Sequence, residues 1–147
     1  MKASDFFTRE QQAQILSAIK KAEENTSGEI RIHIETNLNG DVLDRAAWIF
    51  NKIGMHKTEA RNGVLLYLAV TNKKFAVIGD QGINRKVNKE FWNEAKEIIQ
   101  KHFREEKYSD GLAEAILLIG QQLKDHFPRK KDDVNELPNE ISYDIPE

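Results

Sequence analysis

The chain contains no cysteine among its 147 residues. This absence excludes disulfide bonds, thiolate metal sites and cysteine nucleophiles together. It is compatible with a protein that folds in a reducing compartment. Any metal site or catalytic site must therefore be built from oxygen ligands, histidine or backbone groups.

Long hydrophobic segments are also missing. The longest uninterrupted apolar run, Val64–Val70, has seven residues, whereas a transmembrane helix needs about 20. The N-terminal sequence MKASDFF lacks the apolar stretch of a signal peptide, and neither end carries a lipidation motif. We therefore expect a soluble, cytoplasmic protein without a membrane span.

The chain has no excess of positive charge. Its formal net charge is −2. The residues from Arg129 onward include three basic and six acidic side chains, which leaves a balance of +1 for the preceding part. A nearly neutral body without a basic stripe disfavours nucleic-acid binding. With 39% apolar and 31% charged residues, we expect one globular domain rather than disorder.

Several catalytic motifs are absent as well. The sequence has no GxSxG nucleophile elbow, no P-loop and no GxGxxG fingerprint, which argues against several classes of hydrolase and nucleotide-binding enzyme. The four histidines are isolated and show no HExxH spacing, so we do not expect a zinc site. They are His33, His56, His102 and His126.

Hydrophobic periodicity predicts four helices and three strands. Apolar residues at helical spacing, together with a capping box formed by Thr8 and Gln11, predict helices over residues 8–25, 43–53, 88–106 and 112–126. Residues Tyr108 to Gly111 are expected to break the chain between the last two. Alternating or continuous apolar residues predict strands over 29–36, 63–70 and 74–78.

The order α-β-α-β-β-α-α then constrains the topology. The first two strands are joined through a helix, so they should be parallel with a right-handed crossover. The third strand follows a short turn and should form an antiparallel hairpin with the second. These relations predict an α/β fold, a small mixed β-sheet with helices on both faces.

The last 20 residues differ from the rest of the chain. Pro128 to Glu147 contain all three prolines and most of the charge imbalance. We interpret them as an acidic, mobile tail that follows a domain of residues 1–127. A few apolar side chains of this tail are candidates to dock on the body: Leu137, Ile141, Tyr143 and Ile145.

Strand direction places polar side chains together at one edge of the predicted sheet. The first two strands begin at this edge and the third ends there. The oxygen atoms gathered at this edge are suited to Ca²⁺ or Mg²⁺, and the candidate metal ligands are Glu29, Asp80, Asn62 and Asn84. Arg61 could hold a phosphate or pair with a carboxylate. In a simpler interpretation, Gly79 and Gly82 form a strand-to-helix turn whose amides Asp80 caps.

Two further sets of residues are weaker candidates. The opposite edge of the sheet collects a secondary set, Asp41, Asp44 and Asp110, although the first two are equally explained as residues that begin a helix. The polar face of the first strand places a carboxylate near an imidazole, which can support acid–base catalysis. Its alternative is a solvated face with cross-strand ion pairs; the residues are Glu29, Arg31, His33 and Glu35.

Four blocks of the sequence resemble, in order, the TPM domain of thylakoid lumen, photosystem II repair and worm receptor-modulating proteins. The blocks are TSGEIRIHIE, GMHKTEARNGVLLYLAV, FAVIGDQGIN and HFREEKYSDGLAEAILLIGQQL. The resemblance extends over residues 6–127, and RNGVLLYLAV and GDQGI are its most specific parts. Arg61, Asn62 and Gly63 match the family's residues before the central strand. Gly79 and Gly82 match its glycine pair, with Asp80 inside the same block.

The resemblance implies a Rossmann-like α/β sandwich, divalent cation binding, Ca²⁺ in particular, and the acid phosphatase activity attributed to plant members. The chain also departs from the family pattern. Many secreted members carry an Asp-Asp pair before the first helix, where this chain has only Asp5. Many have a signal peptide and a C-terminal membrane helix, and neither is found in this sequence.

Two functions follow as hypotheses. The first is a monomeric, non-enzymatic Ca²⁺-binding module whose ordered loops bind a protein partner, for instance at a membrane. The second is a metal-dependent acid phosphatase, in which the cation and Arg61 neutralise phosphate charge and Glu29 or Asp80 orients water. The missing nucleophile motif and the missing Asp-Asp pair favour the module.

Overall fold

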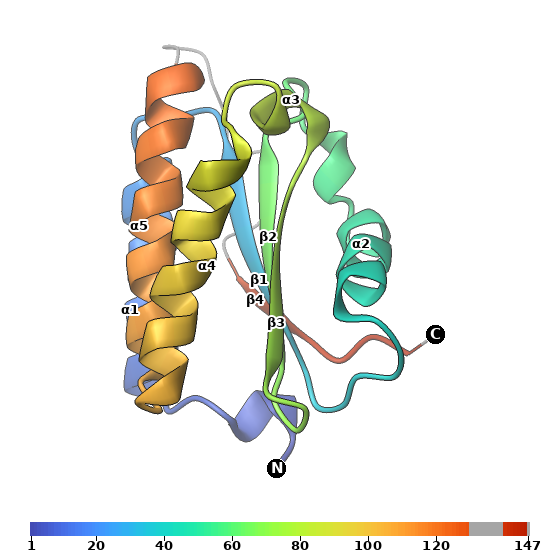
Figure 1. Cartoon of the computed structure of the whole chain (residues 1–147). Helices are drawn as coiled ribbons and strands as arrows, with labels where there is room; N and C mark the ends of the chain where they lie inside the picture. The colour runs from blue at the N-terminus through green and yellow to red at the C-terminus, as the bar shows by residue number, and fades with distance from the viewer. Residues whose placement is uncertain (130–139, 147) are drawn as a thin grey trace.

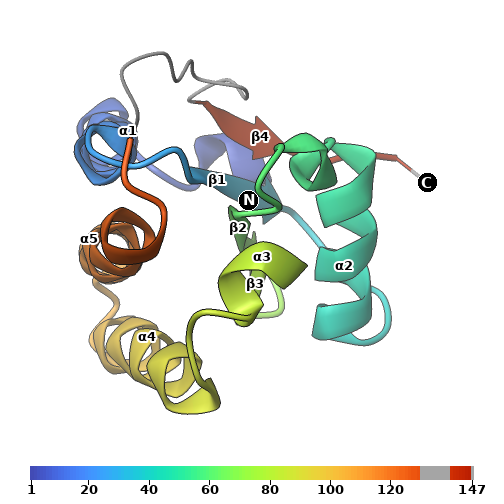
Figure 2. The same cartoon turned by 90° about the horizontal axis from the view of Figure 1, so that it is seen from above.

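A four-stranded mixed sheet forms the middle layer of the protein (Figures 1 and 2). The computed structural model describes residues 1–129 and 140–146. The strands lie in the order β3-β2-β1-β4. β1 is parallel to β2 and to β4, and β3 is antiparallel to β2. Their bounds are β1 Glu29–Glu35, β2 Gly63–Ala69, β3 Lys74–Gly79 and β4 Ile141–Tyr143.

Helices cover both faces of this sheet. On one face lie α1 (Arg9–Glu23), α4 (Lys89–Arg104) and α5 (Tyr108–His126), and on the other lies α2 (Val42–Lys52), as Figure 2 shows. The short elements are two 3₁₀ turns, η1 (Ala3–Asp5) and η2 (Met55–Lys57), and one helical turn, α3 (Gln81–Asn84). No helix within the described ranges is long and apolar enough to cross a membrane. The predicted α/β class, mixed sheet and two helical layers are confirmed.

Two hydrophobic cores result, one on each face. Ile30, Ile32 and Ile34 of β1 belong to the larger core, which α1, α4 and α5 close. Leu65 and Tyr67 of β2 belong to the smaller core beneath α2. The helix α5 packs between α1 and α4 (Figure 1), which explains why its sequence is apolar almost all round. The predicted capping box of α1 is present, with Thr8 and Gln11 bonded reciprocally.

The boundary between α4 and α5 differs from the prediction. Tyr108 begins α5 instead of breaking the chain, and the break lies at 105–107, where Glu106 has φ 59°. Gly111 lies inside α5. A Cβ at this position would come within 2.7 Å of the Cβ of His102, so the glycine permits close packing of α5 on α4 and does not end a helix.

The C-terminal segment contributes a strand that the sequence did not predict. β4 pairs with β1 in the register Ile32↔Ile141 to Ile34↔Tyr143. The expected docking of Ile141, Tyr143 and Ile145 is confirmed, because the first two pack on the larger core and the third on the smaller one. Leu137 lies outside the described residues, and the mobility of the tail stays a prediction.

Candidate functional site

The strand register brings the primary candidate residues to one edge of the sheet, the end that carries α3 in Figure 1. Glu29 lies opposite Gly63 in the β1–β2 pairing. The Asp80 N–H donates to the carbonyl oxygen of the same Gly63 at 2.9 Å. Glu29 at the start of β1 and Asp80 directly after β3 therefore lie at a common edge of the sheet, with β2 between them, as strand direction predicts.

Arg61 forms a bidentate ion pair with the Asp80 carboxylate. Its Nε lies 2.7 Å from Oδ2 and its Nη2 lies 2.9 Å from Oδ1. The N–H of Gln81 donates to the same Oδ1 at 2.8 Å, and Asp80 is buried. Hydrogen bonding to Asp80 raises the pKa of Arg61. Of the two roles that the sequence left open for Arg61, the structure shows pairing with a carboxylate.

The side-chain amides of Asn62 and Asn84 at this edge form hydrogen bonds to other protein groups. Asn84 donates to the Gly79 carbonyl at 2.8 Å and accepts from the Trp92 indole N–H at 3.0 Å. Asn62 donates to Ser27 Oγ at 3.2 Å, while its Oδ1 is buried without a hydrogen-bond partner among the described residues. Glu29 is 3% exposed. Among the residues that the structure describes, this edge does not present a converging set of accessible oxygen ligands for Ca²⁺.

The secondary candidates divide between the two faces of the sheet. Asp41 is the N-cap of α2, and its Oδ2 accepts from the Asp44 N–H at 3.0 Å. Asp110 lies on α5 and accepts from Gln14 Nε2 of α1 at 2.7 Å. Because α5 and α2 cover opposite faces (Figure 2), Asp110 does not join Asp41 and Asp44 in one site.

A hollow of about 470 Å³ opens at the N-terminus of α2. Asp41 and Asp44 are both exposed there. Arg45 and Trp48 line the same hollow, with the Arg45 guanidinium 4.5 Å from the centre of the Trp48 ring. Asn39 and Gly40 complete the lining. The two carboxylates are accessible to an ion from solvent, in contrast to that of Asp80.

The polar face of β1 is buried, so the expectation of a solvated face is wrong. His33 is 0% and Glu35 2% exposed. Glu35 accepts hydrogen bonds from the Tyr67 hydroxyl at 2.6 Å and from Nε and Nη2 of Arg45 at 2.8 and 2.6 Å. β4 covers the other side of this network, where Ser142 Oγ lies 2.7 Å from His33 Nδ1. The C-terminal segment and α2 together exclude water from this face.

The network changes the acidity of two groups. Burial alone would raise the pKa of Glu35, but hydrogen bonds from Arg45, His33 and Tyr67 outweigh it and hold this pKa well below its usual range. Burial raises the pKa of Tyr67 above its usual range, and the hydrogen bond to Glu35 raises it further. Glu35 therefore stays ionised. The His33 ring, whose Nε2 lies 3.4 Å from Glu35 Oε2, is buried and inaccessible to a substrate in solution.

Sequence reasoning missed three members of this network: Arg45, Tyr67 and Ser142. One signal was present in the sequence. Tyr67 carries the only hydroxyl in the otherwise apolar run from Val64 to Val70. A buried tyrosine hydroxyl needs a hydrogen-bond partner, and the register places His33 directly opposite on β1.

The ionised Glu35 should make stability depend on pH. Its pKa in the folded protein lies below the value of about 4.3 for an unfolded glutamate, so stabilisation is complete above about pH 5 and is lost as the pH falls further. We expect the free energy of unfolding, measured with denaturant, to fall between about pH 5 and pH 3. Glu35→Gln should be less stable at pH 7 and show a flatter dependence.

Glu97→Gln is the matched control, because Glu97 is exposed on α4. It should retain the wild-type pH dependence. An equally steep loss of stability in Glu35→Gln would show that other carboxylates cause it.

The described ranges contain no group of three or more histidine, aspartate and glutamate side chains arranged to hold a metal ion. A comparison with protein-family models matches residues 1–122 to the TPM domain. The chain belongs to the TPM domain family. Two of the four blocks that carried the resemblance, GMHKTEARNGVLLYLAV and FAVIGDQGIN, contain the β2–β3 hairpin strands and the edge with Arg61 and Asp80.

Solved structures extend this result. The NMR structure of the BA42 protein from the psychrophilic bacterium Bizionia argentinensis is 44% identical, with a TM-score of 0.90, and the match covers 97% of this chain and 99% of that one. The N-terminal domain of a P. gingivalis protein matches at 18% identity and a TM-score of 0.66, over 84% of this chain and 80% of that one. The latter likeness shows the shared fold alone.

A third NMR structure, the N-terminal domain of the cg2496 protein from Corynebacterium glutamicum, matches with a TM-score of 0.65 at 12% identity. That match covers 80% of this TPM domain chain and 74% of the other. No curated protein matches this TPM domain chain.

Proposed function

We propose that this TPM domain is a non-enzymatic binding module that takes a divalent cation, Ca²⁺ in preference to Mg²⁺, in the hollow at the N-terminus of α2. One observation carries the proposal. The carboxylates of Asp41 and Asp44 are exposed on that hollow, whereas Arg61 and the Gln81 N–H occupy both oxygens of Asp80. The proposal therefore favours the secondary set of candidates, Asp41 and Asp44, as the cation ligands.

The chemistry of the hollow supports Ca²⁺ more than Mg²⁺. Ca²⁺ accepts six to eight oxygen ligands in flexible geometry, while Mg²⁺ demands an octahedron and loses water reluctantly. Asp41, Asp44 and the Asn39 side chain would supply part of such a shell, and water the rest. With only two carboxylates, we expect an affinity on the order of 10⁻⁴ to 10⁻³ M.

The phosphatase hypothesis has less support. It requires Asp80 or Glu29 to orient a water molecule beside a cation and Arg61. Asp80 is instead held by Arg61, and Glu29 is buried. A module that binds a cation at Asp41 and Asp44 requires no free carboxylate beside Arg61.

A calcium titration followed by amide NMR shifts tests the proposal. Saturable shifts should centre on Gly40 to Asp44 in the wild type. They should disappear in Asp41→Asn/Asp44→Asn, which removes charge but retains a side chain that can cap α2.

Asp110→Asn is the control, because it removes one carboxylate from α5 and should leave the titration unchanged. Shifts that centre on Asn62 and Asp80 would contradict the proposal. So would aryl phosphate hydrolysis that is lost in Asp80→Asn.

A further inference from the structure

β3 is the outermost strand on one side of the sheet, and within the described residues it pairs with β2 alone. The long side of β3 that faces away from β2 is therefore an open strand edge. Hydrogen-bonded and non-hydrogen-bonded pairs alternate along an antiparallel ladder, and Asp80 is bonded to Gly63 directly opposite. Ile78, Ala76 and Lys74 therefore bond toward β2. The backbone groups of the residues between them, Phe75, Val77 and Gly79, point away from the sheet.

One end of this edge is already closed. The Gly79 carbonyl accepts from Asn84 Nδ2 at 2.8 Å, which agrees with the outward direction of its backbone. The remaining stretch from Phe75 to Ile78 spans roughly 10 Å at about 3.3 Å per residue. That length accommodates one short added strand.

A groove runs beside this edge, between β3 and α4. One hollow of about 260 Å³ is lined by Val77, Gly79 and Trp92, with side chains of α4. A second, of about 310 Å³, lies farther along at Phe75 and Phe103. These two rings meet edge to face with their centres 5.4 Å apart. The groove thus has an aromatic floor along the open backbone edge.

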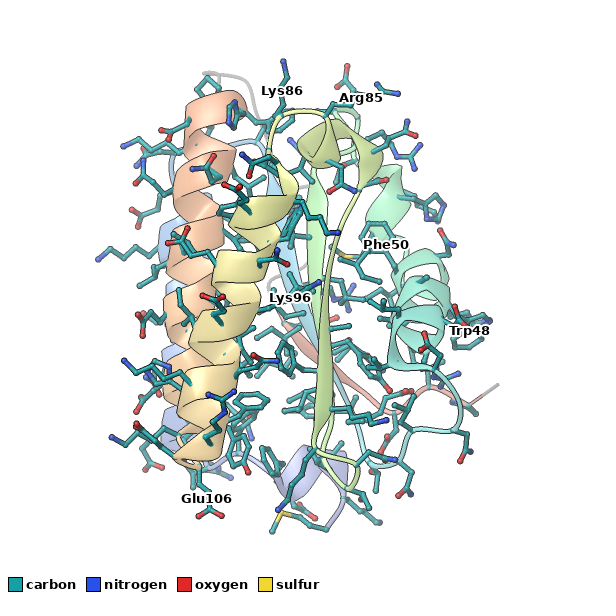
Figure 3. The ribbon with its side chains drawn as sticks, viewed as in Figure 1. Trp48, Phe50, Arg85, Lys86, Lys96 and Glu106 are labelled. Carbon is teal, nitrogen blue, oxygen red and sulfur yellow. The ribbon has the colours of Figure 1, made fainter. Side chains whose placement is uncertain are left out.

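The walls of the groove are basic. Among the residues that line the two hollows, Lys73, Lys89, Lys96 and Arg104 are charged, and none is acidic. Three of these cations follow one stripe of α4 at helical spacing, and Figure 3 shows Lys96 on the side of α4 that faces the strands. α4 also carries acidic residues, but they line neither hollow: Glu90, Glu94 and Glu97.

We propose that the groove between β3 and α4 binds a short, acidic, extended segment of a partner protein, which adds to the sheet as a strand beside β3. Outward backbone groups of Phe75 and Val77 would bond to the segment, and alternate side chains of the segment would enter the two hollows. Carboxylates of the segment would pair with the cations of the walls.

Charge and geometry select this occupant over two others. A second copy of the chain docked groove to groove would bring lysines against lysines, which repel. A nucleic acid would satisfy the cations but not the open N–H and C=O groups of a strand edge. The inference rests on the proposed role as a binding module. It does not depend on the cation hollow, which lies on the α2 face of the sheet.

A designed peptide tests the inference. Fluorescently labelled acetyl-Glu-Thr-Val-Thr-Phe-Thr-Glu-amide, in which both glutamates lie on the same strand face as the two apolar side chains, should bind the full chain saturably and shift the amide signals of Phe75 and Val77. The same peptide with lysine in place of each acidic residue should not bind. Lys89→Glu/Lys96→Glu should weaken binding of the acidic peptide by about tenfold, while Lys101→Glu, an exposed lysine of α4 outside the groove, should not.

Three results would each overturn the proposal that the groove binds an acidic segment. They are equal binding of both peptides, an unchanged affinity in Lys89→Glu/Lys96→Glu, and absence of saturable binding. A calcium titration of the same samples separates the two proposals. A normal calcium response without peptide binding overturns the groove alone, whereas peptide binding without a calcium response overturns the cation site alone.

Discussion

Replacement of Arg45 by methionine should lower the free energy of unfolding by about 3–5 kcal/mol. Two nitrogens of Arg45 donate to Glu35, whose carboxylate is almost fully buried. Without the guanidinium, only the Tyr67 hydroxyl and the His33 ring would remain near that charge. Arg45 Nη2 also donates to the Ile145 carbonyl at 2.8 Å, so the substitution should loosen the C-terminal segment as well.

Denaturant unfolding at pH 7 measures this loss. Arg85→Met is the matched control, since Arg85 is exposed at the other end of the molecule (Figure 3), and it should change stability by less than about 0.5 kcal/mol. Arg45→Met/Glu35→Met should regain part of the loss, because no unpaired charge stays buried. A loss below about 1 kcal/mol in Arg45→Met would show that solvent reaches the pair.

The second large effect is expected at Gly82. Its backbone packs against the preceding loop, and its N–H donates to the Arg61 carbonyl at 2.8 Å. A Cβ at this position would overlap the carbonyl oxygens of Ala60 and Arg61. Both are backbone atoms, so the turn itself must move. Gly82→Ala should therefore cost about 3 kcal/mol and displace Arg61 from Asp80.

Gly40→Ala separates this overlap from ordinary backbone strain. Gly40 has φ +89°, and a Cβ at this position would meet no atom within 4 Å, so only the conformational cost of about 1 kcal/mol applies. Thermal or denaturant unfolding of both variants gives the comparison. If Gly82→Ala were as stable as Gly40→Ala, the close approach of the two loops would not be a constraint.

The arrangement of the sheet could be predicted because it follows from short-range patterns. Ile30, Ile32 and Ile34 alternate with polar residues, and the run from Val64 to Val70 is apolar on both faces. The positions of these strands, and the central place of the second in the sheet, could therefore be predicted. Parallel and antiparallel relations then followed from the connections. β4 could not be predicted, because a segment of three residues is too short to show the alternating pattern of a strand. Its partner strand also lies more than 100 residues away in the sequence.

The candidate site was predictable in its position but not in its chemistry. Strand direction alone brings Glu29 and Asp80 to one edge of the sheet. Whether Arg61 would hold a phosphate or a carboxylate depended on its local geometry: the backbone has φ 52°, and the side chain pairs with Asp80. Likewise, the burial of the polar face of β1 was not predictable, because Arg45 and Ser142 approach it only in the folded chain.

Manganese-induced broadening of amide NMR signals tests whether a cation binds in the hollow at the N-terminus of α2. Mn²⁺ binds the same carboxylate and carbonyl oxygens as Ca²⁺ and broadens the signals of nearby amides. We expect the amide signals of Gly40, Asp41 and Asp44 to broaden first and excess Ca²⁺ to restore them. First broadening at Asn62, Asp80 and Gln81, with the α2 end unaffected, would contradict this expectation.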